Sequence, residues 1–278
     1  MFSQPTRKRF GQHWLTSEKV LRHIVAAAAV TDRDIVLEIG PGTGVLTQSL
    51  LPLAQAVVAV EIDRDLSRRL SQKFAQTPNL HLIEGDFLAL DDTALELPTP
   101  PLLESVRSRP NQVVANIPYY ITGPILEKLL GTIAHPNPQP YDSIILLVQK
   151  EVAERLYAQP GSRAFGALSV RVQYLADCEL VCPVPAKAFQ PPPKVDSAVV
   201  KITPRPLPVV AESPDDLDQL VRLGFASKRK MLRNNLKATV DRDHLLAVMT
   251  ELAIPDNARA EDLDVPQWVA LSNRLNQS

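Results

Sequence analysis

Cysteine is scarce in this chain of 278 residues, and glycine is scarce beside proline. The two cysteines, Cys178 and Cys182, are too few for a disulfide framework or a thiolate metal site. We therefore expect buried thiols, no bound metal and a reducing, cytoplasmic location. Ten glycines stand against twenty-five prolines. The prolines gather in four clusters that indicate loops, and the last, at residues 204–208, predicts a linker between two domains.

An excess of charge of one sign and long apolar runs are also missing. Thirty basic side chains against thirty-one acidic ones give a formal charge of -1, so a nucleic-acid partner would have to meet a local basic patch. No apolar segment follows the N-terminal cations Arg7, Lys8 and Arg9, and the alanine run at residues 26–29 is too short to span a bilayer. We therefore expect a globular protein without a signal peptide or membrane span.

A strand, a glycine loop and a helix follow one another near the N-terminus. Residues 34–39 are mostly apolar, Gly40-Pro41-Gly42-Thr43-Gly44 comes directly after them, and residues 45–53 suit a helix. This order is typical of the first unit of a nucleotide-binding α/β fold. A helix is predicted over residues 17–30, and further strands at residues 57–60, 80–83, 112–115 and 143–148. The pattern predicts a mostly parallel, Rossmann-like sheet with helices on both faces.

Polar or turn-forming residues stand at the end of four of these strands. They are the glycine loop, Glu61, Asp86 and Asn116. Each alone is an ordinary loop residue, turn or helix cap. Because parallel strands of such sheets end at one edge, where ligands bind, we expect the four to meet in one binding site.

The glycine spacing and the acids around it indicate the ligand. Gly-X-Gly-X-Gly is one residue short of the dinucleotide fingerprint, and no Gly-Lys-Ser/Thr follows as in a P-loop. Four acids, Glu38, Glu61, Asp63 and Asp86, border the predicted site. This setting favours a cationic ligand with a ribose and an adenine, and S-adenosylmethionine fits better than NAD.

The tetrapeptide Asn116-Ile117-Pro118-Tyr119, with Tyr120 after it, is the candidate for chemistry. Asn116 offers a carbonyl acceptor and Tyr119 a flat aromatic face, which together could hold a heterocycle with an exocyclic amino group. The alternative is a turn that closes a strand.

Several blocks carry a resemblance to a known family. They are Arg9 to Leu15, Glu38 to Gly44, Glu61, Gly85-Asp86, Asn116 to Tyr119, Phe165 to Val170, Phe189 to Ser197 and Phe225 to Leu236. The set resembles the KsgA/Erm family of rRNA adenine N6-dimethyltransferases, and most closely its KsgA branch. The resemblance covers roughly residues 7 to 237, and the blocks from Phe189 and Phe225 are more specific than the glycine loop.

The resemblance implies an S-adenosylmethionine site. Its residues would be His13, Leu15, Gly40, Gly42, Glu61, Asp86 and Asn116. By the same resemblance Glu61 would bind the ribose hydroxyls and Asp86 the adenine amino group. His13 departs from the family pattern, which usually has Asn there, and could instead be an ordinary surface residue.

The resemblance also implies how the substrate adenine is held. Asn116 and the Ile117 carbonyl, supported by Pro118, would orient the N6 amino group, while Tyr119 stacks on the base and Phe189 faces it from the other side. The alternative for Phe189 is packing in the core. Tyr120 would contact RNA.

A catalytic domain at residues 1–205 and a helical RNA-recognition domain at 206–278 are expected. The second shows helical patterns at residues 215–226, 228–237, 242–252 and 265–275. Six cations and no acid occur from residue 222 to 237: Arg222, Lys228, Arg229, Lys230, Arg233 and Lys237. All but Lys228 would share one face of an unbroken helix, as an RNA-binding stripe or simply a solvated face. Residues 91–110 are expected to form a surface insertion without chemistry.

The resemblance implies dimethylation of two adjacent adenines near the 3' end of small-subunit (16S) rRNA, by a monomeric enzyme acting on the immature small subunit. An Erm-like enzyme for large-subunit rRNA is one alternative. An assembly factor that binds RNA without catalysis is another, and DNA adenine methylation is a third.

Overall fold

The computed structural model describes residues 13–97, 107–206 and 209–277. The N-terminal cations Arg7 to Arg9 and the middle of the predicted insertion lie outside these ranges. The described chain forms two compact units. The first runs to Leu129 and adds Gln139–Ala153 and Glu179–Thr203, and the second comprises Leu130–Pro138, Glu154–Cys178 and the residues from Pro204 onward.

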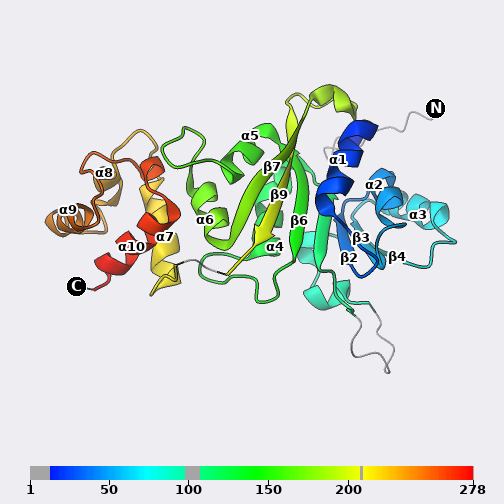
Figure 1. Cartoon of the computed structure of the whole chain (residues 1–278), viewed down its shortest axis with the longest axis horizontal. Coiled ribbons are helices and arrows are strands. Elements are labelled where there is room, and N and C mark those ends of the chain that lie inside the picture. The colour runs from blue at the N-terminus through cyan, green and yellow to red at the C-terminus, as the bar shows by residue number, and fades with distance from the viewer. Residues whose placement is uncertain (1–12, 98–106, 207–208, 278) are drawn as a thin grey trace. The chain divides into compact units, whose positions relative to one another are not determined.

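A seven-stranded sheet has the strand order β4-β3-β2-β5-β6-β9-β7 (Figure 1). Its strands are β2 (Ile35–Ile39), β3 (Ala56–Glu61), β4 (Leu80–Glu84), β5 (Gln112–Asn116), β6 (Ser143–Gln149), β7 (Ala176–Val184) and β9 (Ser197–Pro204). The five predicted strands are all present and parallel to one another. The sequence reasoning missed β7 and β9, and β9 runs antiparallel to β6. Pro183 lies inside β7, although it belongs to a proline cluster that indicated a loop. Strand β7 is at the sheet edge, where proline is tolerated.

Helices lie on both faces of this sheet. Figure 1 shows α1 (Glu18–Ala28) across the front of the strands and α4 (Thr122–Leu130) behind them. The helix predicted at residues 17–30 is confirmed as α1, and the Ser17 side chain accepts a hydrogen bond from the Val20 N–H as its N-cap. The first unit also holds α2 (Val45–Leu50) and α3 (Arg64–Lys73), while α5 (Lys150–Leu156) follows β6.

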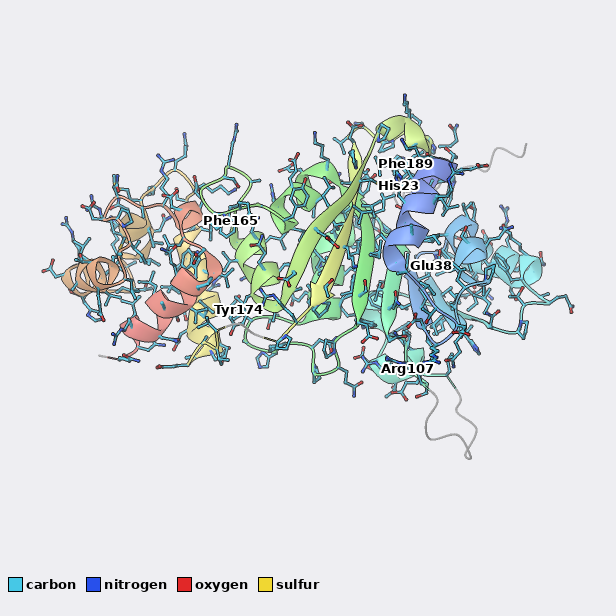
Figure 2. The ribbon with its side chains drawn as sticks, viewed as in Figure 1. His23, Glu38, Arg107, Phe165, Tyr174 and Phe189 are labelled. Carbon is cyan, nitrogen blue, oxygen red and sulfur yellow. The ribbon has the colours of Figure 1, made fainter. Side chains whose placement is uncertain are left out.

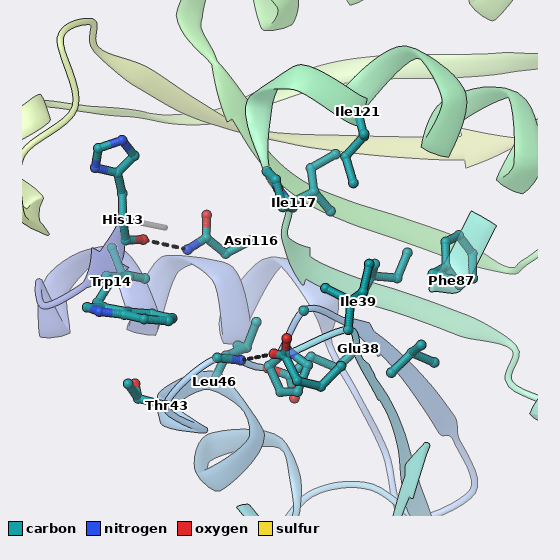
Figure 3. Close-up of a pocket in the computed structure, with 18 of the residues that line it drawn as sticks. His13, Trp14, Glu38, Ile39, Thr43, Leu46, Phe87, Asn116, Ile117 and Ile121 are labelled. Carbon is teal, nitrogen blue, oxygen red and sulfur yellow. Dashed lines mark hydrogen bonds between the residues drawn. The ribbon is translucent and has the colours of Figure 1, made fainter. Parts of the chain in front are cut away.

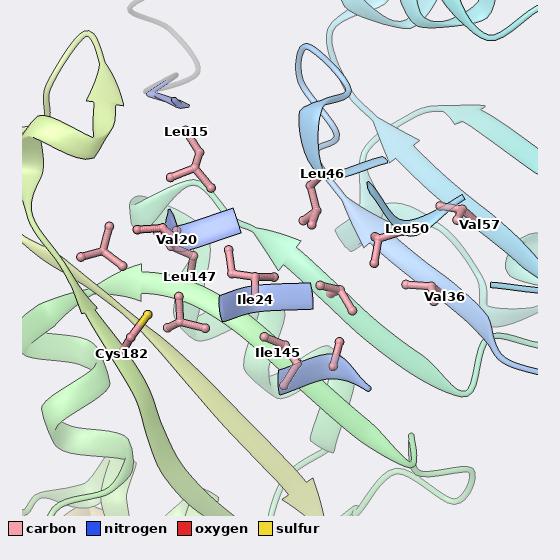
Figure 4. Packing of buried hydrophobic residues seen from close by; sticks show 14 of the residues in the cluster. Leu15, Val20, Ile24, Val36, Leu46, Leu50, Val57, Ile145, Leu147 and Cys182 are labelled. Atoms are coloured by element: carbon pink, nitrogen blue, oxygen red, sulfur yellow. The ribbon is translucent and has the colours of Figure 1, made fainter. Parts of the chain in front are cut away.

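The core beneath α1 is built from apolar side chains of the central strands. Val36, Val57, Ile145 and Leu147 are at most 1% exposed, and Ile24 of α1 packs on this layer (Figure 4). Each such side chain contributes about 1.5–3 kcal/mol when fully buried. Ladder pairing aligns Ile39 with Val60. The strands of this layer therefore end together at one edge.

A second, two-stranded sheet joins segments far apart in the sequence. Strand β1 (Trp14–Leu15) pairs antiparallel with β8 (Phe189–Gln190). The Thr16 N–H donates to the Ala188 carbonyl at 2.8 Å and extends this pairing. The N-terminal segment is thereby fixed to the block that precedes β9.

The second unit contains α6 (Ala167–Leu175), α7 (Pro214–Gly224), α8 (Leu232–Leu236), α9 (Arg242–Glu251) and α10 (Val265–Leu275). The helix expected at residues 228–237 is wrong in its first half. Residues 228–231 form turns, because the Lys230 N–H donates to the Ser227 carbonyl and Met231 bridges to Arg259. The cations of residues 222–237 therefore do not share one continuous helix. No helix in the described part of the chain combines the length and apolar character needed to cross a membrane.

Candidate active site

One cavity lies at the carboxyl ends of β2, β3, β4 and β5, in the first unit (Figure 3). The site residues predicted for cofactor and catalysis line it together: His13, Leu15, Gly40, Gly42, Glu61, Asp86, Asn116, Ile117, Pro118 and Tyr119. Tyr120, predicted to contact RNA, lines it as well and is 64% exposed. The four strand ends singled out in the sequence thus meet in one place.

The glycine loop between β2 and α2 is partly covered by Trp14. Gly40 and Gly42 have φ angles of 68° and 61°, a region that favours glycine. A Cβ atom at Gly42 would lie 2.5 Å from the Trp14 ring, so the indole packs directly on the loop backbone. A Cβ atom at Gly40 would meet no atom within 4 Å, so the loop leaves open space beside this residue.

Glu61 ends β3 as a buried carboxylate that is 4% exposed. Its two oxygens accept hydrogen bonds from the Gly42 N–H at 3.0 Å and the Asp63 N–H at 2.9 Å. Burial raises the pKa of Glu61, and these two donors oppose the rise. Because each carboxylate oxygen can accept two hydrogen bonds, Glu61 can still accept a pair of hydroxyls from a ligand.

Asp86 follows β4 and lines the same cavity as the glycine loop. Its Oδ1 accepts the Leu88 N–H at 3.0 Å and so caps the short helix Phe87–Ala89. The residue is exposed, and its carboxylate remains able to accept further hydrogen bonds. Asp86 is therefore both a helix cap and a cavity-lining acid.

Glu38 is the most deeply buried acid of the cavity, at 1% exposed. Its Oε2 makes no hydrogen bond to any residue that the structure describes. Burial raises the pKa of Glu38 to about 8, and polar contacts from the side chain and backbone of Thr47 oppose this rise. The Glu61 carboxylate adds to the rise, and the Lys73 ammonium opposes it. A buried carboxyl group with one oxygen unpaired is stabilised in its charged form by an incoming cation. The cavity is thus suited to a positively charged ligand.

Asn116 is the last residue of β5, and its side-chain amide faces the N-terminal segment. Its Nδ2 donates to the His13 carbonyl at 3.5 Å, as Figure 3 shows. The His13 Nδ1 lies 2.8 Å from the Pro191 carbonyl, where it can only be the donor. With Nδ2 engaged in this way, the Oδ1 acceptor of Asn116 is left for a group in the cavity.

Tyr119 is held on two sides. Its hydroxyl lies 2.6 Å from the Ser197 Oγ, and its ring stacks beside that of His13 with centroids 6.1 Å apart and planes at 22°. Burial raises the pKa of Tyr119, so the phenol stays neutral near neutral pH. The ring thus lines the cavity in a defined orientation.

Phe189 does not line the cavity, contrary to its expected place opposite Tyr119. The ring is 2% exposed and belongs to the hydrophobic core beneath β1, because β8 turns it inward while pairing with Leu15. The alternative of core packing is what the structure shows. Figure 2 labels where Phe189 lies in the chain.

Sequence reasoning also missed Trp14 and Phe87 as cavity-lining residues. Trp14 stands between two predicted residues in the Arg9 to Leu15 block, which was the available signal. Phe87 follows Asp86 directly.

Comparison with known proteins places this geometry in context. Residues 3–277 match the family described as ribosomal RNA adenine dimethylase. The chain belongs to that family. It is accordingly a methyltransferase, and the Rossmann-like fold expected from the sequence is confirmed by solved structures that are similar to it.

The relatives within the family match nearly the whole chain. A protein of Trichormus variabilis named ribosomal RNA small subunit methyltransferase A is 61% identical over 269 residues, which cover 97% of each chain. One of the same name from Nostoc punctiforme is 58% identical over 275 residues, covering 97% of this chain and 94% of that one.

Two solved structures also cover nearly the full length. A dimethyladenosine transferase from Plasmodium falciparum has a TM-score of 0.77 at 29% identity, covering 95% of this chain and 98% of its own. The 23S rRNA methyltransferase ErmE has a TM-score of 0.72 at 27% identity, covering 95% and 100%.

The second unit of the chain carries the cations that are predicted to bind RNA. Arg222, Arg229, Lys230 and Lys237 are exposed. Arg233 differs, because it is 25% exposed and its Nη1 pairs with the Asp256 carboxylate at 3.1 Å. The prediction that these cations form one stripe on a single helix face is therefore wrong. Arg233 forms an ion pair with Asp256 inside the second unit.

Glu38 makes the stability of the unliganded enzyme depend on pH. Its pKa is raised from 4.5 to about 8, so the folded chain keeps a proton that the unfolded chain releases. Stability therefore falls as pH rises through this window. We expect Glu38→Gln to raise Tm relative to the unmutated protein at about pH 8 and to change it much less at about pH 5.

Scanning calorimetry of the unliganded protein at both pH values measures this difference. Glu127→Gln, at an exposed position of α4, is the control and should show no pH-dependent gain. A Tm difference for Glu38→Gln that is equal at both pH values would contradict the raised pKa.

Proposed function

We propose that this methyltransferase uses S-adenosylmethionine to dimethylate the N6 amino groups of two adjacent adenines near the 3' end of small-subunit (16S) rRNA. Its substrate is the immature small subunit, and it acts in the cytoplasm as a monomer. The observation that carries the proposal is the cavity at four strand ends, with Asn116 and Tyr119 at its rim and Glu61 within it. The family match and the names of the 61% and 58% identical relatives support it.

The cavity residues fit S-adenosylmethionine. Glu61 has acceptor capacity left for two ribose hydroxyls, Asp86 can accept from an adenine amino group, and the open space at Gly40 leaves room along the loop. The unpartnered Oε2 of Glu38 suits a cationic amino-acid group. His13 and Leu15 line the same cavity from the N-terminal segment and complete the proposed cofactor site.

Bound S-adenosylmethionine supplies an electrophilic methyl group on its sulfonium. The N6 nitrogen of adenine is a weak nucleophile, because its lone pair is delocalised into the ring. The Asn116 Oδ1 and the Ile117 carbonyl accept its two hydrogens and so free the lone pair for attack. They also stabilise the positive charge that develops on nitrogen, and removing one preorganised acceptor of this kind costs about 3 kcal/mol.

The chain needs no strong general base for this reaction, since the ammonium formed on N6 is acidic enough to lose its proton to water. Tyr119 stacks on the target base once the base leaves its helix, a contact worth about 1–3 kcal/mol. Pro118 is itself extended and restricts Ile117, the residue before it, to extended backbone, which limits the directions that the Ile117 carbonyl can take. After the first transfer and loss of a proton, N6 keeps one hydrogen, which one of these two acceptors still accepts during the second transfer.

RNA is held mainly by residues outside the cavity. We assign catalysis to residues 1–205 and RNA recognition to residues 206–278, where Arg222, Arg229, Lys230 and Lys237 can meet phosphates. Tyr120, exposed at the cavity rim, contacts the RNA next to the target base.

A large-subunit substrate is the second candidate, because ErmE, a 23S rRNA methyltransferase, has the same fold over 95% of the chain. Its identity of 27% is far below the 61% of a relative named for the small subunit, which favours the small subunit.

Asn116→Ala should lower the rate of methyl transfer far more than it weakens cofactor binding. Loss of one acceptor lowers kcat by about a hundred-fold or more. The protein is incubated with methyl-labelled S-adenosylmethionine and immature small subunits, naked 16S rRNA, naked 23S rRNA or duplex DNA. The affinity for S-adenosylhomocysteine is measured in parallel by calorimetry.

Label in N6,N6-dimethyladenine of small-subunit RNA is the expected result for the unmutated protein. Label confined to 23S rRNA or DNA would refute the proposed substrate. Transfer by Asn116→Ala at the unmutated rate would refute the mechanism.

Arg229 and Arg233 should respond differently to charge reversal. Arg229→Glu should weaken RNA binding and reduce the slope of log affinity against log salt by about 1 to 2, because an exposed phosphate contact is lost. Arg233→Glu should instead lower Tm, because it removes the partner of Asp256. Filter binding over a salt series and thermal unfolding separate the two, and equal effects of both variants on RNA binding would contradict this division.

A further inference from the structure

Ser197 is a buried polar residue beside the cavity to which the proposed mechanism gives no role. It is the first residue of β9, it is 0% exposed, and it pairs with Gln149 of the central strand β6. Its Oγ lies 2.6 Å from the Tyr119 hydroxyl, across 78 residues of sequence. A buried hydroxyl is costly to leave unpaired, so the two groups hold each other in place.

The Tyr119 ring needs such a tether, because its own segment has little regular structure. Tyr119–Ile121 is a single turn of 3-10 helix that begins without a side-chain cap. The local hydrogen bonds of this turn join the Ile121 N–H to the Pro118 carbonyl and the Thr122 hydroxyl to the Tyr119 carbonyl. Both act on the backbone and leave the ring free to change rotamer. The phenol oxygen is where the ring itself is fixed to the sheet.

The second neighbour of the ring leads to the same part of the chain. His13 stacks beside Tyr119, and its Nδ1 donates to the carbonyl of Pro191. Pro191 directly follows β8 and Ser197 begins β9, so the two residues lie at the ends of one connecting segment. This one segment therefore sets the position of the Tyr119 ring in two ways, through the His13 imidazole and through the Ser197 hydroxyl.

We propose that Ser197 is a positioning residue for methyl transfer, which holds the Tyr119 ring through its phenol oxygen so that one fixed face meets the target adenine. This inference rests on the proposed function, because it assigns Ser197 to the same site. Ser197 touches no reacting atom and acts only through Tyr119. A ring that rotates presents its face for part of the time, so loss of the tether lowers kcat and leaves cofactor affinity unchanged.

A double-mutant cycle tests the coupling. Ser197→Ala removes one hydroxyl of the pair, Tyr119→Phe removes the other while keeping the ring, and the third variant combines them. We expect each single variant to lower kcat about ten-fold, and the double variant to lie within about two-fold of either, because all three lack the same bond. Affinity for S-adenosylhomocysteine should not change.

Ser169→Ala is the matched control. Ser169 is also 0% exposed and its Oγ donates to the Arg155 carbonyl at 2.6 Å, but it lies in the second unit. It should lower Tm as Ser197→Ala does and leave kcat unchanged. Additive losses in the cycle, an unchanged kcat in Ser197→Ala, or an equal loss in Ser169→Ala would each overturn the assignment.

A readout without RNA separates this inference from the proposed function. The chain has five tyrosines, so 3-fluorotyrosine labelling gives few fluorine resonances, and the Tyr119 signal is assigned by its absence in Tyr119→Phe. Ser197→Ala should shift or broaden that signal. An unmoved signal in an enzyme that methylates small-subunit RNA overturns the tether alone. A moved signal in an enzyme without transfer to that RNA overturns the proposed function and leaves the contact standing.

Discussion

The parallel main-chain pairing of β2 with β3 and β5 is the constraint on which the whole site depends. Parallel ladders keep neighbouring strands in one direction, so each strand delivers its last residues to the same edge. A core of almost completely buried side chains packs against these strands and fixes their positions relative to one another. A glycine loop, a carboxylate and an amide that are far apart in the sequence are thereby brought together in space.

Burial then decides what this edge can bind. Glu38 and Glu61 sit in one cavity with little solvent, and desolvation raises the pKa of both. Amide donors from Gly42 and Asp63 keep Glu61 partly compensated, whereas the Oε2 of Glu38 has no partner among the described residues. A ligand that carries positive charge relieves this cost, and one with a pyrophosphate would increase it. The electrostatics of the protein therefore favour a cationic ligand over one that carries a pyrophosphate.

The elements that sequence predicted well are those whose local pattern agrees with their final surroundings. Apolar runs gave the five parallel strands, and the residues that follow them gave most of the cavity. The pairs that link distant segments could not be predicted in this way, because neither β1 nor β8 is longer than two residues. Phe189 was misplaced for the same reason, since its direction depends on pairing with Leu15. The predicted basic stripe was wrong because Met231 and Leu232 pair with the segment near Arg259, which interrupts the helix.

The central claim is that the four strand ends form one cofactor site. Amide hydrogen exchange of the full chain, with and without saturating S-adenosylhomocysteine, tests it directly. If the four strand ends form one cofactor site, exchange slows at residues 38–44, 61–63, 85–88 and 116–119 and does not change in α7 to α10. Unchanged exchange at these strand ends under saturation, or protection concentrated in the helical unit, would contradict it.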